Sequence, residues 1–550
     1  MVNIICLNIF VEQNSREWRS YIGRIERGHN QDHIRGLFRD AFGCTYRARV
    51  TPLPCCLTPG DYHIARKPKD WSIMETYPVI IGGKTRETEE TSDVRFPYTG
   101  EVYARVCHAR ASDLEDAITS AVAGFEQMRR LSSYERSKIL DRLADEIRQR
   151  ADELVNAMVM EGGKTKKFAM AEVARAEMTV RISAEEARRI YGEILPLDWS
   201  SDTKHRTGYL MRFPVGPVLG IIPFNFPVNL ACHKLAPAIA AGNSIILKPA
   251  SATPVSGLLL GEMVIAAGAP ADAINVVPCP GERAETMVRD PRIAFLSFTG
   301  SCAVGWHLKE IAGRKRVGLE LGGNAAVIVH EDANLKFAAS RIATGGFINA
   351  GQVCISVQRV LIQRSVYEET VAKIMAAARL LKVGDPRDPA TDVGPMIDRE
   401  KAGDAHRKVQ EAVSQGAGVL LGGTYEGGLF APTILEHTTA EMRVNREEVF
   451  APVISVTPYD EFDEAVRIAN ASDFGLQVGI FTQNVNRVMR AFEEMKVGGV
   501  IINDIPSFRV DHMPYGGTRG SGTGREGPRY SIEEMTELRL LVINRDGGIG

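Results

Sequence analysis

The chain has 550 residues, 44% of them hydrophobic and 24% charged, with a formal net charge of −2 at pH 7. This is the composition of a globular protein with several domains, and the near-neutral charge gives no general argument for binding of nucleic acid or of an anionic membrane. The nine cysteines include no CxxC pair, so neither a disulfide framework nor a metal site is expected, and a reducing, cytoplasmic location is favoured. No apolar run approaches the roughly 18 residues that span a bilayer, so the expected partner is a small molecule.

The first part of the chain differs from the rest. It holds four of the nine cysteines, and its PLPCCLTPG stretch follows neither helical nor strand periodicity. Ordinary patterning begins with METYPVIIGGK, which opens at Met74. We expect residues 1–73 to be a disordered extension or the result of a misassigned start, with Met74 as the natural first residue.

A long amphipathic helix is predicted next. Ser132 and Glu135 fit a capping box. A stripe of apolar residues then continues along one face through Ile139, Leu143, Ile147, Leu154 and Met158. This pattern is typical of a helix that packs against a core.

Short apolar runs then alternate with helical stretches: GPVLGII, NLACHKLAPAIAAG, NSIILKP, TPVSGLLLGEMVIAAG, INVVP and AFLSFTG. A second series with AAVIVH, RVLIQ, VGIFTQ and VIIN follows from about residue 325. Strands that alternate with helices indicate parallel strands joined by crossover helices, so an α/β fold with a doubly wound sheet is predicted.

The residues that follow these strands are the candidates for a site, because ligands of such sheets bind at the carboxyl ends of the strands. Asn225 follows the first run within PFNFP, Lys248 ends NSIILK, and Glu320 ends RVGLE. Gly300 and Ser301 lie between a strand and a helix start, where free N–H groups can hold an anion. A single glycine-rich turn is a weak signal, and the joint pattern is stronger than any one member.

The segment FINAGQVCIS raises the question of what Cys354 does. A free cysteine is most often a small buried hydrophobe, and the apolar neighbours Val353 and Ile355 fit that role. A thiolate is also a strong nucleophile when suitable partners surround it. The segment by itself leaves both interpretations open.

Seven motifs occur in order: PFNFP, LKPAS, FTGS, LELGG, GQVC, EEVFAP and PYGGTRGSGTGRE. Together they resemble the aldehyde dehydrogenase superfamily over about residues 75 to 545. The PFNFP, AGQVCIS, PYGG and GREG segments are most similar to the lactaldehyde and non-phosphorylating glyceraldehyde-3-phosphate dehydrogenase-like members.

The resemblance implies a set of catalytic residues. Cys354 matches the nucleophile that forms a thiohemiacetal and then a thioester with the aldehyde carbon. The Asn225 side chain and the Cys354 backbone N–H match the oxyanion hole, and Glu320 matches the base that activates water for hydrolysis of the thioester. With these partners the nucleophile becomes the favoured role of Cys354.

The cofactor implied is NAD or NADP. The residues that match its binding positions are Pro223, Phe224, Lys248, Ser251, Gly281, Thr299, Gly300, Ser301, Glu448 and Phe450. Ser251 stands where strongly NAD-selective members place a glutamate that repels a 2′-phosphate, so NADP is admissible. Ala451 replaces a common glycine, which we expect to be tolerated. Glu161 is expected on a solvated helix face, without a role in binding.

Substrate residues are the third implication. Phe226 and Arg509 match positions of the substrate funnel, and an arginine fork suits a carboxylate, a phosphate or a hydroxyl-rich tail. The alternative for Arg509 is a salt bridge, with Asp511 as one partner. We expect small polar 2-hydroxyaldehydes, including phosphorylated ones, as substrates.

The implied architecture has a Rossmann-like cofactor domain at 75–195 and 213–325 and a catalytic domain at 326–530. A β-ribbon oligomerisation element would combine 196–212 with 531–550, giving a homodimer or homotetramer. Two alternative functions stay open: a dehydrogenase that transfers the acyl group to CoA, against which Glu320 argues, and a catalytically silent structural or binding member of the fold.

Overall fold

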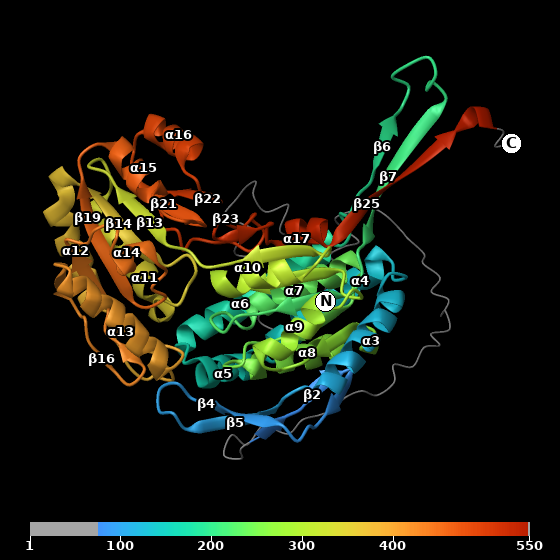
Figure 1. The fold of residues 1–550 in the computed structure, drawn as a ribbon, viewed down its shortest axis with the longest axis horizontal. Coiled ribbons are helices and arrows are strands. Elements are labelled where there is room, and N and C mark those ends of the chain that lie inside the picture. The colour runs from blue at the N-terminus through green and yellow to red at the C-terminus, as the bar shows by residue number, and fades with distance from the viewer. Residues whose placement is uncertain (1–74, 548–550) are drawn as a thin grey trace, which may run out of the picture. The chain divides into compact units, whose positions relative to one another are not determined.

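Two α/β sheets dominate residues 75–547, which are the residues that the computed structural model describes (Figure 1). These residues belong to one unit, Lys67–Gly550. The predictions for residues 1–73 and for a start at Met74 lie outside the described residues. Within the described range no helix has the length and apolarity needed to cross a membrane.

The first sheet has the strand order β24-β12-β11-β8-β9-β10-β2-β3. Its parallel strands are β8 (Val218–Ile221), β9 (Ile245–Lys248), β10 (Ile274–Val276), β11 (Phe295–Thr299) and β12 (Arg316–Glu320). At its edges lie β2 (Val79–Ile81), β3 (Lys84–Arg86) and β24 (Gly522–Thr523), which pair antiparallel. From β8 the chain builds outward through β9 and β10, and it then crosses to the other side of β8 for β11 and β12. The predicted doubly wound sheet is confirmed.

Helices cover both faces of this sheet because its strands are apolar on both sides. Val218 packs with the helices α4 (Ser133–Gln149), α5 (Ala151–Gly162), α6 (Lys166–Glu186), α7 (Asn229–Ala241) and α8 (Pro254–Ala266). Its neighbour Leu219 points to the opposite face, toward α3 (Ala111–Met128), α9 (Gly281–Arg289) and α10 (Cys302–Ile311). Such continuous apolar strands are typical of parallel sheets buried on two sides.

The second sheet has the order β15-β18-β19-β14-β13-β21-β22. Its strands are β13 (Ala325–Val329), β14 (Val357–Gln363), β15 (Gly418–Leu421), β18 (Thr433–Glu436), β19 (Val453–Tyr459), β21 (Gln477–Phe481) and β22 (Gly499–Ile502). Its helices are α11 (Leu335–Phe347), α12 (Tyr367–Arg379), α13 (Arg399–Ser414), α14 (Arg443–Arg446), α15 (Phe462–Asn470) and α16 (Val485–Glu494). All its strand pairs are parallel except that of β15 with β18.

A three-stranded antiparallel ribbon projects away from both sheets (Figure 1). It consists of β6 (Glu193–Pro196), β7 (Arg206–Pro214) and β25 (Thr536–Asn544), and α17 (Pro528–Glu534) leads into it. β6 starts three residues before the boundary expected for the ribbon. β24, from the range expected for the catalytic domain, joins the first sheet instead.

Smaller elements complete the described chain. β1 (Glu75–Tyr77), β4 (Thr91–Arg95) and β5 (Val102–Cys107) form a small sheet. Two antiparallel pairs join β16 (Tyr425–Glu426) to β17 (Leu429–Phe430) and β20 (Phe474–Gly475) to β23 (Thr518–Arg519). Short 3-10 turns lie at Ala271–Ala273, Ile348–Gly351, Arg364–Val366 and Arg545–Gly547.

The predicted amphipathic helix is confirmed as α4, with one difference. The Ser132 hydroxyl accepts the Glu135 N–H at 3.2 Å, and the Glu135 carboxylate accepts the Ser132 N–H at 2.7 Å. The helix ends at Arg150, which lies outside helical geometry, and a separate helix, α5, carries Leu154 and Met158. Both of these residues still pack into the same core as α4.

The expectation for Glu161 is wrong. Its side chain is buried near the end of α5, and its carboxylate accepts the backbone N–H groups of Val255 at 2.7 Å and Ser256 at 3.0 Å. It therefore caps the first turn of α8, whose free N–H groups and dipole favour an anion. Burial raises the pKa of Glu161 to about 7.

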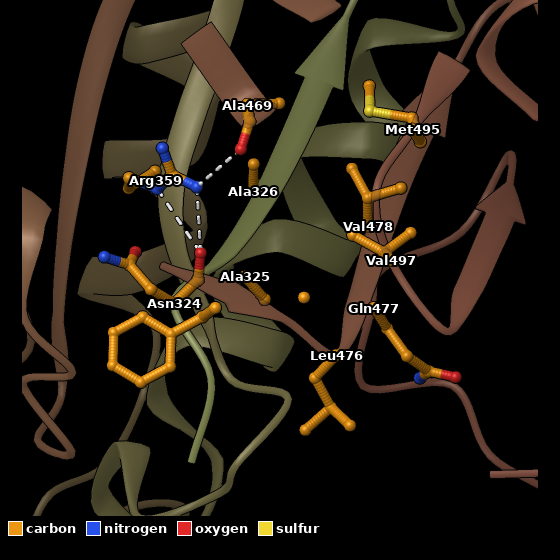
Figure 2. Close-up of a pocket in the computed structure, with 12 residues that line it drawn as sticks. Asn324, Ala325, Ala326, Arg359, Ala469, Leu476, Gln477, Val478, Met495 and Val497 are labelled. Carbon is orange, nitrogen blue, oxygen red and sulfur yellow. Dashed lines mark hydrogen bonds between the residues drawn. The ribbon is translucent and has the colours of Figure 1, made fainter. Parts of the chain in front are cut away.

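A small cavity beside β13 is structural (Figure 2). Its volume of about 10 Å³ is that of one water molecule. Arg359 lies there, buried, and donates to the backbone carbonyl groups of Asn324, Ile468 and Ala469. Since Ile468 and Ala469 are in the last turn of α15, Arg359 supplies donors to carbonyl groups at the end of that helix.

Candidate active site

One cavity of about 890 Å³ lies at the carboxyl ends of β8, β9, β11 and β12. It includes the place where the strand order reverses, between β8 and β11, which is where doubly wound sheets bind ligands. All predicted catalytic and cofactor residues line it: Pro223, Phe224, Asn225, Lys248, Ser251, Gly281, Thr299, Gly300, Ser301, Glu320, Cys354, Glu448 and Phe450. Segments far apart in the chain thus meet at one site.

A left-handed turn carries Cys354 to the cavity. Asn349, Ala350 and Gly351 have φ values of 50°, 53° and 69°, a conformation that side chains other than glycine rarely adopt. A Cβ atom on Gly351 would lie 2.0 Å from the carbonyl oxygen of Ala451. The turn therefore requires glycine at this position, and it is strained at the two residues before it.

Asn225 connects the exit of β8 to this turn. Its side-chain Nδ2 donates to the carbonyl oxygen of Gln352 at 2.9 Å, while its Oδ1 atom is buried without a partner among the described residues. The amide has a second N–H. Because the first bond fixes the amide group, this second donor is held in place at the cavity.

The thiol of Cys354 lies in an apolar environment. Val353, Ile355, Leu476 and Tyr515 form a small buried cluster against which Cys354 packs. Burial raises the pKa of the thiol to about 12, and a hydrogen bond between its Sγ atom and the Tyr515 hydroxyl, 2.9 Å long, opposes that shift.

Glu320 is the carboxylate at the end of β12. Its backbone carbonyl accepts the Gly300 N–H at 3.1 Å, which holds the exits of β11 and β12 together. The side chain is buried, and its Oε2 atom has no partner in the described part of the chain. Burial, reinforced by the charge of Glu526, raises the pKa of Glu320 well above its ordinary value. A carboxyl group of this kind suits the role of a general base.

Two buried charges beside Glu320 were not predicted from the sequence. The Lys234 ammonium donates to the Thr299 hydroxyl at 2.7 Å and lies 3.8 Å from a Glu526 carboxylate oxygen. Burial lowers the pKa of Lys234. The sequence did contain a signal for Lys234, because the stretch NLACHKLAPAIAA has no polar face and a lysine there must be buried. In the structure every residue of α7 is buried.

The other end of the cavity offers groups for anions and hydroxyls. The helices α9 and α10 begin there at Gly281 and after Ser301, and neither start has a side-chain cap among the described residues. A Cβ atom on Gly281 would have no neighbour within 4 Å. Lys248 ends β9 at the cavity, and burial lowers its pKa. Free helix starts with an ammonium group fit the pyrophosphate and ribose of a dinucleotide.

Glu448 and Phe450 border the cavity between these two ends. The Glu448 carboxylate accepts the Gly323 N–H at 3.0 Å, and burial raises its pKa to about 7. Phe450 has a φ of 53°, and its ring meets that of Phe224 edge to face at 5.9 Å. The second sheet thus supplies a carboxylate and a ring to a cavity built mainly by the first.

The two predicted substrate residues lie beside the cavity and are not among the residues that line it. Arg509 is buried and donates to Glu526 at 2.7 Å. The salt-bridge alternative is therefore what the structure contains, although Glu526 replaces Asp511 as the partner; Asp511 pairs with Arg175. The ring of Phe226 packs with the Cys354 cluster.

Comparison with known proteins matches residues 84–541 to the aldehyde dehydrogenase family. The 3-sulfolactaldehyde dehydrogenase of Priestia aryabhattai is 43% identical over 472 residues, which are 86% of this chain and 98% of that protein. The lactaldehyde dehydrogenase of Methanococcus aeolicus is 36% identical over 459 residues, with 82% and 97% covered. The crystal structure of glyceraldehyde-3-phosphate dehydrogenase GapN from Methanocaldococcus jannaschii, complexed with NADP, has a TM-score of 0.80 at 36% identity, with 83% and 100% covered.

The chain therefore belongs to the aldehyde dehydrogenase family, and it is an NAD(P)-dependent oxidoreductase that acts on aldehydes. The resemblance to lactaldehyde and glyceraldehyde-3-phosphate dehydrogenase-like members is confirmed as well.

Proposed function

We propose that this enzyme oxidises a small polar 2-hydroxyaldehyde to the acid, with Cys354 as nucleophile, Asn225 as oxyanion donor and Glu320 as base. The observation that carries the proposal is that these three residues line the same cavity as the groups that fit a dinucleotide.

The first step is attack of the Cys354 sulfur on the aldehyde carbon. A carbon–sulfur bond forms, and the electron pair of the carbonyl π bond moves to oxygen. The free N–H of the Asn225 amide and the backbone N–H of Cys354 would hold that oxyanion. The bond from Asn225 to Gln352 prepares the donor before the charge develops.

A nicotinamide cofactor held in this cavity would supply the hydride acceptor that oxidation of this adduct to a Cys354 thioester requires. Lys248, Gly281 and Ser301 would hold its ribose and pyrophosphate, with Pro223, Phe224, Thr299 and Gly300 around them. Glu448 and Phe450 would position the nicotinamide ribose. Ser251 carries no negative charge that would oppose a 2′-phosphate, so NADP and NAD both remain candidates.

Glu320 would then take a proton from water, which attacks the thioester carbon and releases the acid and the Cys354 thiolate. Its unpartnered Oε2 supports this role. Transfer to CoA would need no such base. Activity that requires CoA would favour the alternative of a CoA-acylating dehydrogenase. Full activity of Cys354→Ala would mean that the reaction takes place at a different site.

The polar substrate is supported by the surroundings of Arg509 and by the relatives. Asn229, His233 and Asp511 form a buried hydrogen-bonded group next to Arg509. The Nε atom of Arg509 is buried and has no partner within the described residues, so Arg509 supports a polar tail through the positive charge of its guanidinium beside the cavity. The relatives' names specify lactaldehyde, sulfolactaldehyde and glyceraldehyde 3-phosphate.

The test is a comparison of lactaldehyde, glyceraldehyde 3-phosphate and hexanal with the full chain, under each cofactor. Values of kcat/KM at least about tenfold higher for the polar aldehydes are expected. Equal values of kcat/KM for hexanal would contradict the proposed substrate class, but they would not contradict the roles proposed for the catalytic residues.

The remaining proposals concern assembly and location. A homodimer or homotetramer formed through the ribbon is supported by the apolar residues that β25 and β7 expose, such as Leu541 and Met211. A cytoplasmic location is supported by the cysteines of the described residues, all of which are free thiols.

A further inference from the structure

The hydroxyl group of Tyr515 is in direct contact with the reacting atom of the site. Its oxygen lies 2.9 Å from Sγ of Cys354. When the sulfur is a thiol, either atom can donate this bond. When the sulfur is a thiolate, only the hydroxyl can donate, and the bond becomes charge-assisted and stronger.

The ring of Tyr515 is fixed from two sides. Its backbone pairs with that of Glu526 through two hydrogen bonds, of 2.9 Å and 2.6 Å. The guanidinium of Arg509 lies over the ring, 3.9 Å from its centroid, and the same guanidinium is paired with the Glu526 carboxylate. Glu526 thus holds both the ring and the cation above it.

The charges that face this pair fall into two groups. Arg509 faces both Cys354 and Tyr515, and it favours their anionic forms. Glu320 faces both of them and Glu448 faces the thiol, and these carboxyl groups oppose the anions. Burial keeps the pKa of the Tyr515 hydroxyl well above its ordinary value, so that it carries its proton at any working pH.

We propose that Tyr515 is a thiolate-stabilising residue: its hydroxyl donates to the ionised sulfur of Cys354, and the stacked Arg509 strengthens that donor. This inference rests on the proposed function, because it assumes that Cys354 is the nucleophile. It gives the Arg509–Glu526 pair a role in addition to the one proposed for Arg509 toward the substrate tail.

The physical reason is that the apolar cluster around Cys354 makes the thiolate costly. Val353, Ile355 and Leu476 pack against Cys354 and leave it only partly exposed, and a thiol in such surroundings is a poor nucleophile. A cation over an aromatic face withdraws charge from the ring, and a phenol that has lost electron density donates a stronger hydrogen bond. The bond to Tyr515 therefore replaces part of the lost solvation.

The test is the pH dependence of alkylation by iodoacetamide, in which a carbon–sulfur bond forms, iodide leaves and the thiol proton passes to solvent. Modification of the Cys354 peptide is followed by mass spectrometry, so that the other cysteines do not interfere. In Tyr515→Phe the rate of alkylation at each pH between 7 and 9 should fall by about three- to tenfold, because a hydrogen bond to a charged group is lost and less thiolate forms at a given pH. Tyr459→Phe, a buried control on β19 away from the cavity, should leave the rate unchanged.

A second variant keeps the test valid if Tyr515→Phe does not fold. Incorporation of 3,5-difluorotyrosine at position 515 makes the phenol a stronger donor at nearly constant size, and it should raise the alkylation rate at the same pH values. A rate that neither change moves would overturn the inference. Cys354→Ala distinguishes the two proposals: if this variant keeps its dehydrogenase activity, the proposed function fails, whatever the alkylation profiles show.

Discussion

The side-chain amide of Asn225 donates a hydrogen bond to the backbone carbonyl of Gln352 at 2.9 Å. This bond joins the exit of β8 to the turn that carries Cys354, so the proposed oxyanion donor and the proposed nucleophile are fixed relative to each other. Pre-organisation of this kind is what makes an oxyanion donor effective.

Removal of this donor should reduce catalysis. Asn225→Ala is expected to lower kcat by about 10²- to 10³-fold, measured by nicotinamide reduction with lactaldehyde. Binding of NADP, measured by fluorescence titration, should change little. A kcat within about twofold of the wild type would mean that Asn225 does not face the developing oxyanion.

The charge at position 251 should select between the cofactors. Ser251→Glu is expected to raise the KM for NADP by at least about tenfold, because a carboxylate next to a 2′-phosphate is repelled, and to leave the KM for NAD nearly unchanged. Ser251→Gln is the control, since it has the same size without the charge. Equal effects of both substitutions on NADP would point to steric blocking.

The stability of the fold should depend on pH through Glu161. Its pKa rises from an ordinary value of 4.5 to about 7 in the folded state, so the folded state binds this proton more tightly. The contribution to stability is complete below about pH 4.5 and is lost as the pH rises to about 7. It amounts to at most about 3 kcal/mol.

Glu161→Gln removes this titration. The free energy of unfolding of the variant minus that of the wild type should therefore increase between pH 5 and pH 8, as measured by urea denaturation. A difference that is the same at both values would show that Glu161 does not titrate in this range.

The ribbon should control assembly. Leu541 on β25 is 59% exposed, and Leu541→Glu would place a charge in any interface formed there. We expect smaller particles in sedimentation velocity experiments than for the wild type. Leu380, at the end of α12, is 84% exposed, and Leu380→Glu should leave the particle size unchanged. The same size for all three proteins would exclude the ribbon as the interface.

Strand exits made much of this site predictable from the sequence. Asn225, Lys248 and Glu320 each follow an apolar run, and a parallel sheet brings the carboxyl ends of its strands to one edge. The turn before Cys354 could not be predicted, because three consecutive left-handed residues leave no periodicity in the sequence. The role of Cys354 was inferred from the other motifs instead.

Other features depend on tertiary contacts that patterning does not encode. Glu161 occupies an ordinary helical position, and only the approach of α8 makes it a cap. Arg509 was assigned a nearby partner along the chain, whereas the pairing of Tyr515 with Glu526 brings the Glu526 carboxylate to it instead. Such partners are set by the way loops return to the sheet.

The central claim, that Cys354 carries the acyl group and Glu320 hydrolyses it, is tested most directly with Glu320→Gln. The full chain with this substitution is mixed with lactaldehyde and NADP, and both nicotinamide reduction and the mass of the Cys354 peptide are followed. The account predicts one equivalent of reduction per active site, then slow turnover, with the acyl group on Cys354. Sustained turnover at the wild-type rate, or an unmodified Cys354 after the burst, would contradict it.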